Sequence, residues 1–113
     1  MHEMSICESV VQILKEQARF HGYSRVKAVW LEIGPLAAVE PEAMRFCFDA
    51  VTRGTLAEKA RLEIVDIPAT AWCMACAKGV RIANRFDSCP DCGSHQMQIT
   101  GGDELRIKQM EVD

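Results

Sequence analysis

The chain has 113 residues and a mass of 12.6 kDa, enough for one small domain or for a small core that carries a metal-stabilised lobe. Hydrophobic residues make up 49% and charged residues 26%, values that exclude a disordered, collagen-like or membrane-spanning chain. The formal net charge of −3 disfavours nucleic acid as a partner, because the chain as a whole does not attract phosphate backbones.

The start of the chain has the wrong charge pattern for a targeting segment. Its first residues include the carboxylates Glu3 and Glu8 but no lysine or arginine before Lys15. No apolar run approaches the roughly 18 residues that a membrane-spanning helix needs. We therefore expect a cytoplasmic protein that does not bind membranes. Because cytosolic thiols stay reduced, its six cysteines favour a metal or redox role over disulfides.

The N-terminal region predicts an amphipathic helix. Apolar residues recur at spacings of three and four over residues 4–21, and Gly22 is expected to end the helix. Ser5 and Glu8 form a capping-box pattern that would start the helix directly after the serine. A start near Glu3 is equally compatible, because a carboxylate is favourable at the positive end of a helix.

The remaining periodic segments predict one more helix and a small sheet. Residues 29–33 alternate as a central strand that ends at Gly34-Pro35. A second helix is expected over residues 41–54, with proline at its first position. Residues 62–67 and 105–112 are the other two expected strands. We therefore predict an α+β fold in which two helices pack on a three-stranded sheet.

The composition changes between Pro68 and Gly102, where apolar periodicity fades and cysteine, glycine and isolated polar residues take over. Because this stretch lies between two expected strands, it interrupts the first domain. We expect an α+β domain of residues 1–67 and 103–113 and an inserted lobe of residues 68–102.

The inserted lobe contains two Cys-x-x-Cys pairs separated by twelve residues, namely Cys73, Cys76, Cys89 and Cys92. This spacing lets two tight turns converge on one ion and is typical of a structural zinc ribbon. Zinc contributes about 10–16 kcal/mol of apparent folding energy, which such a small lobe could not gain from apolar burial alone. The competing interpretation is a redox-active dithiol, which two pairs at ribbon spacing disfavour.

Several other residues have structural interpretations. Gly93 permits the tight turn after the second cysteine pair, and Ala77 takes the equivalent place after the first. Cys7 and Cys47 lie on the helical apolar stripes and are expected to be small buried hydrophobes without chemistry. His95 is expected to lie at the surface.

His2 lies one residue from the N-terminal amine, which gives it a chemical option that internal histidines lack. The amine of Met1, the amide nitrogen of His2 and its imidazole Nδ1 can close adjacent chelate rings in a plane, with Glu3 at the fourth position. This geometry suits nickel(II) or copper(II). The amine and the imidazole, with pKa values of about 8 and 6.5, must both lose protons, so mild acid should release the metal. The alternative is that His2 is a solvated terminal residue.

Four stretches together resemble the hydrogenase nickel-insertion accessory proteins, the HypA/HybF family. They are Met1-His2-Glu3, residues 25–34, the stretch Phe46–Asp49 and the paired cysteine motifs. The resemblance implies a metallochaperone, not an enzyme, that delivers Ni²⁺ to the [NiFe]-hydrogenase large-subunit precursor. It also implies a GTP-hydrolysing, HypB-like accessory partner.

The resemblance further implies His2 as the nickel ligand, with Met1 and Glu3 contributing backbone groups, and the four cysteines as zinc ligands. Glu40 lies where an acidic residue of the family can approach nickel. We expect a monomer or a weak homodimer. One alternative is a zinc-ribbon adaptor that carries no transported metal. A small zinc hydrolase fails, because four thiolates leave no open position for water.

Overall fold

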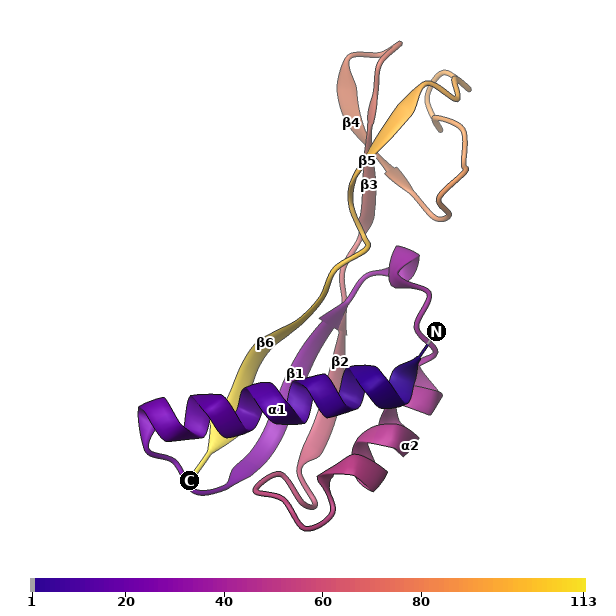
Figure 1. The fold of residues 1–113 in the computed structure, drawn as a ribbon. Coiled ribbons are helices and arrows are strands. Elements are labelled where there is room, and N and C mark those ends of the chain that lie inside the picture. Colours follow the sequence, from indigo (N-terminus) through magenta and orange to yellow (C-terminus); the bar gives the residue numbers. More distant parts are fainter. Residues whose placement is uncertain (1) are drawn as a thin grey trace. The chain divides into compact units, whose positions relative to one another are not determined.

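The computed structural model describes residues 2–113 (Figure 1). Its strands form two three-stranded sheets with the orders β2-β1-β6 and β4-β3-β5. The elements in chain order are α1 (Glu3–His21), β1 (Val26–Ile33), the 3-10 helix η1 (Pro35–Ala37), α2 (Pro41–Thr52), β2 (Arg61–Asp66), β3 (Ala69–Cys73), β4 (Lys78–Ile82), β5 (Met97–Gly101) and β6 (Leu105–Val112). The expected α+β class is confirmed, with β1 as the central strand of the first sheet.

The chain divides into two compact units, which we describe separately. The first unit contains α1 and α2 and most of β1, β2 and β6. The second unit comprises Glu32–Ala38 and Asp66–Leu105. It includes the whole stretch 68–102 and also residues 32–38, which the sequence placed with the first domain. The backbone explains this grouping, because the Gly34 N–H donates to the Glu104 carbonyl at 2.9 Å and the Leu36 N–H to the Gly102 carbonyl at 2.7 Å.

Helix α1 begins at Glu3, the earlier of the two expected starts, and the capping box is not used because its serine and glutamate lie inside the helix. The helix ends as predicted. Gly22 adopts a left-handed conformation with φ of 74°, and its N–H donates to the Ala18 carbonyl at 2.9 Å. The buried face of α1 consists of Cys7, Val10, Val11 and Leu14.

Helix α2 starts at Pro41, as predicted, with Glu40 as its N-cap. The helix ends at Thr52, two residues before the expected end at Gly54, since Arg53 already has an extended ψ of 130°. The Thr52 hydroxyl is buried and donates to the Phe48 carbonyl at 2.7 Å. Figure 1 shows α1 and α2 beside each other on the first sheet. The central strand of this sheet, β1, is mostly buried.

The second unit has a very small core, which consists of Ala71, Cys73, Val80 and Cys89. Strand β3 pairs antiparallel with β4 and with β5, and the β3–β5 register shifts between Thr70 and Ala71. Because two of the four core residues are cysteines, apolar burial contributes little to this unit. Among the described residues, no helix is both long and apolar enough to cross a membrane.

Candidate metal centres

The four cysteines of the two Cys-x-x-Cys pairs meet at one point in the second unit. Their sulfur atoms all lie within 4.8 Å of one another. The Sγ atoms of Cys73 and Cys92 are 3.7 Å apart, and those of Cys76 and Cys89 are 3.9 Å apart. A tetrahedral ion with metal–sulfur bonds of about 2.3 Å requires sulfur atoms roughly 3.8 Å apart. The four sulfurs therefore lie close to the arrangement that tetrahedral zinc requires.

The first cysteine pair forms the turn between β3 and β4. Cys73 is the last residue of β3, and the N–H of Cys76 donates to its sulfur at 3.4 Å. The N–H of Ala77 donates to the Cys73 carbonyl at 2.8 Å. Ala77 has a left-handed φ of 55°, an uncommon conformation for a residue with a side chain. In this turn the Cys76 amide points at the Cys73 sulfur, as an amide does in a cysteine metal site.

The second cysteine pair repeats the same turn before β5. The N–H of Asp91 donates to the Cys89 sulfur at 3.4 Å, and the N–H of Gly93 donates to the Cys89 carbonyl at 2.8 Å. Gly93 has a φ of 77°, which glycine adopts without strain. The prediction that Gly93 and Ala77 occupy equivalent positions is confirmed.

Hydrogen bonding makes the thiols unequal. Burial opposes ionisation of Cys89, but backbone N–H groups of Asp91 and Cys92 outweigh it and lower the pKa of this thiol to about 7. A hydrogen bond with Cys92, together with burial, raises the pKa of Cys76 to about 12. The Lys78 ammonium forms an ion pair with the Asp91 carboxylate beside the cluster. One thiol is therefore ready to ionise near neutral pH, and a cation lies close to the thiolates.

The other predicted centre lies at the start of α1. Met1 lies outside the described residues. His2 is the exposed N-cap, and its side chain makes no capping hydrogen bond. The Glu3 carboxylate accepts a hydrogen bond from the Glu40 N–H at 3.3 Å. The pKa of Glu3 is lowered by backbone N–H groups, first that of Glu3 and then that of Glu40. Glu3 thus ties the first turn of α1 to the N-cap of α2.

The remaining histidines and cysteines follow the sequence interpretation in part. His95 is exposed, and His21 lies in the last turn of α1. Cys7 is fully buried, as expected, whereas Cys47 is only partly buried.

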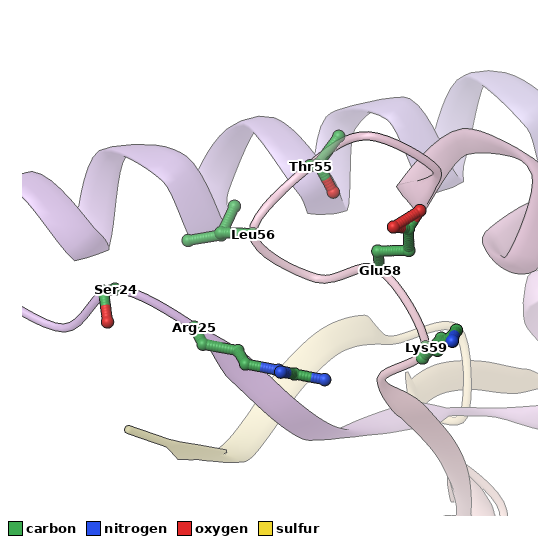
Figure 2. A pocket seen from close by; sticks show the side chains of 6 residues that line it. All are labelled: Ser24, Arg25, Thr55, Leu56, Glu58 and Lys59. Atoms are coloured by element: carbon green, nitrogen blue, oxygen red, sulfur yellow. The ribbon is translucent and has the colours of Figure 1, made fainter.

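A hollow of about 380 Å³ lies in the first unit (Figure 2). Ser24 and Arg25 line it from the segment just before β1. The loop between α2 and β2 contributes Thr55, Leu56, Glu58 and Lys59. Arg25 and Lys59 are its cations and Glu58 its carboxylate. Since no predicted metal ligand lines it, the candidate metal sites are not in this hollow.

The fold and the four-cysteine cluster define a small α+β protein with a zinc-ribbon-like metal centre. A family model described as hydrogenase/urease nickel incorporation, metallochaperone, hypA matches residues 1–112. The chain belongs to this HypA family of nickel metallochaperones.

Relatives support this assignment along the whole chain. It is 64% identical to the hydrogenase maturation factor HypA of Azotobacter chroococcum and 62% identical to that of Azotobacter vinelandii, with full coverage of both chains in each case. Its fold resembles the solution structure of the Ni metallochaperone HypA from Helicobacter pylori, with a TM-score of 0.73 and 24% identity. That likeness covers 99% of this chain and 97% of the other.

Proposed function

We propose that this protein carries nickel(II) in the cytoplasm and delivers it to the large-subunit precursor of a [NiFe]-hydrogenase. The family match over residues 1–112 is the observation that carries the proposal. The full-length relatives named as hydrogenase maturation factors support it. In this role the protein is a carrier and not an enzyme, because its cargo leaves chemically unchanged.

The nickel site that we propose consists of the free amine of Met1, the backbone and imidazole nitrogens of His2, and Glu3. The exposure of the His2 imidazole supports it, because a ligand that must release its metal to another protein needs an accessible position. Two nitrogens of the site must lose protons to bind, so affinity falls on mild acidification. The contact between Glu3 and the Glu40 backbone places a second carboxylate-bearing residue at the same end of the helix pair.

The zinc site that we propose consists of Cys73, Cys76, Cys89 and Cys92. Bound zinc would hold the lobe of residues 68–102 in one conformation, since the apolar core of that lobe is too small to do so. Four thiolates leave no open coordination position, so this centre is structural. The nickel site then belongs to the domain of residues 1–67 and 103–113.

The partners that we propose are a GTP-hydrolysing, HypB-like accessory protein and the hydrogenase large-subunit precursor. Maturation factors of this family act on a hydrogenase, which supports a partner that receives nickel. The protein is then a monomer or a weak homodimer, a form that leaves the N-terminus accessible to either partner.

Nickel titration of three zinc-loaded proteins tests this proposal. The unextended protein should bind one nickel per chain, whereas His2→Ala and a version with extra residues before Met1 should lose that site. His21→Ala is the matched control, because it removes an exposed histidine at the other end of the same helix. Equal nickel affinity in His2→Ala and in the unextended protein would contradict the proposal and favour an adaptor that carries no metal.

A further inference from the structure

Two sulfur-bearing side chains meet between α1 and α2, and a third lies on the same face of α2, outside both metal centres described above. The Sγ of Cys7 lies 4.0 Å from the Sδ of Met44 and 3.5 Å from the Met44 carbonyl oxygen, to which it donates. Both side chains have 0% of their surface exposed. Cys47 lies one helical turn after Met44 and therefore shares its face of α2. We call Cys7, Met44 and Cys47 the sulfur cluster.

The spacing within the sulfur cluster suits one shared ion. With metal–sulfur bonds of about 2.3 Å, two ligands of a trigonal ion lie about 4.0 Å apart. Cys7 and Met44 are already at this separation. Cys47 follows Met44 by three positions in α2, and side chains at this spacing lie next to each other on the helix surface, so Cys47 can supply a third sulfur ligand. Cys47 is only partly buried and gives the ion a way in.

The chemistry of the sulfur cluster selects the ion. Thiolate and thioether ligands favour soft ions such as copper(I), whereas nickel(II) at a planar nitrogen site and zinc at four thiolates use other ligand sets. We propose that Cys7, Met44 and Cys47 form a binding site for a thiophilic monovalent ion, copper(I) or silver(I). On binding, each ligating thiol forms a metal–sulfur bond and loses its S–H proton to water, and no electron is transferred.

An ion at this place would join the two helices that carry Glu3 and Glu40. Because only the folded helix pair holds the three ligands together, such an ion binds the folded first unit more tightly than the unfolded chain and so stabilises it. The inference does not depend on the proposed function, since none of its ligands belongs to the proposed nickel or zinc sites. It makes the helix pair a target for copper(I) and silver(I) separate from the four-cysteine cluster.

Anaerobic titration of the reduced, zinc-loaded full chain with buffered copper(I) tests the inference, with released zinc measured in parallel. The unmodified protein should bind one copper(I) per chain while keeping its zinc. Met44→Leu removes the thioether at nearly constant volume, and Cys47→Ser removes a partly exposed thiol. Loss of a residue that only hydrogen-bonds to a metal ligand weakens metal binding roughly 10–100-fold. Loss of a ligand itself should therefore weaken copper binding at least about tenfold.

Met74→Leu is the control, because it removes an exposed methionine of the second unit and should leave copper affinity unchanged. Helicity and zinc content of each variant show whether it is folded. If Met44→Leu does not fold, the copper affinity of Cys47→Ser alone tests the inference. Copper uptake matched by equal zinc release in the unmodified protein would overturn the inference. So would unchanged copper affinity in folded Cys47→Ser.

Discussion

Adding one methyl group at Gly34 should destabilise the second unit, because two backbone segments touch at this glycine. A Cβ at position 34 would lie 2.0 Å from the Gly102 carbonyl oxygen and 2.2 Å from its carbon. Ordinary van der Waals contact begins near 3.4 Å, so the overlap exceeds 1 Å. The atoms in the way belong to the backbone and cannot rotate aside as a side chain can. Gly34→Ala must therefore push the two segments apart.

The cost of Gly34→Ala follows from what separation would break. The two segments are joined by the hydrogen bonds from Gly34 to Glu104 and from Leu36 to Gly102. Overpacking costs about 1–3 kcal/mol, and each broken hydrogen bond adds about 1 kcal/mol. We expect a loss of about 3 kcal/mol or more in the free energy of unfolding.

Urea unfolding of the zinc-loaded protein measures this loss, with hydrogen exchange of the amides in β3 and β5 as the probe of unfolding. With a slope of about 1–3 kcal/mol per molar, the midpoint should fall by roughly 1–3 M. Gly79→Ala is the matched control, because a Cβ at position 79 of β4 meets nothing within 4 Å. The control should stay within about 0.5 kcal/mol of the unmodified protein. Equal midpoints for the two variants would refute the steric argument.

Three further predictions concern the first-unit core, the helix start and the cysteine lobe. Leu14→Ala, at a fully buried side chain, should cost about 2–5 kcal/mol, whereas Ile13→Ala, at a side chain 44% exposed, should cost less than about 1 kcal/mol; similar urea midpoints would contradict this. The Glu3 carboxyl should titrate by carbon NMR below its ordinary pKa of 4.5. The stabilisation from the contact between Glu3 and Glu40 is therefore complete above pH 4.5 and is lost as the pH falls through the lowered pKa of Glu3. A Glu3 titration midpoint at or above 4.5 would contradict this contact. Removing metal with a chelator should abolish amide protection in β3–β5 and preserve it in α1, and protection surviving in a metal-free lobe would argue against a structural ion.

The elements that local chemistry determines could be predicted from the sequence. Gly22 ends α1 and Pro41 starts α2 where expected, because a left-handed cap and a fixed φ act within one turn. The alternation of residues 29–33 identifies the central strand of the first sheet. The convergence of the four cysteines also follows from local spacing.

Features that depend on distant contacts could not be predicted in this way. The choice between the two starts of α1 involves Glu3 and Glu40, which are 37 positions apart. The grouping of residues 32–38 with the second unit depends on hydrogen bonds to Gly102 and Glu104. The strands β3 to β5 have only five residues each, too few for the sequence to show a clear strand alternation.

The sulfur cluster shows the same limit at the level of a site. Cys7 and Cys47 each fit an apolar helix stripe, so their positions in the sequence predict buried residues without chemistry. Only the packing of α1 against α2 brings Cys7 to Met44, which is 37 positions away. A methionine on a helix stripe carries no ligand signal by itself.

X-ray absorption at the nickel and zinc edges of one sample tests the central claim most directly. The sample is the unextended protein with one equivalent of each metal. The account predicts nickel bound by nitrogen and oxygen in a planar arrangement, through the Met1 amine and His2, while zinc keeps four sulfur neighbours. Sulfur in the nickel coordination sphere, or nickel in place of zinc among the cysteines, would contradict it.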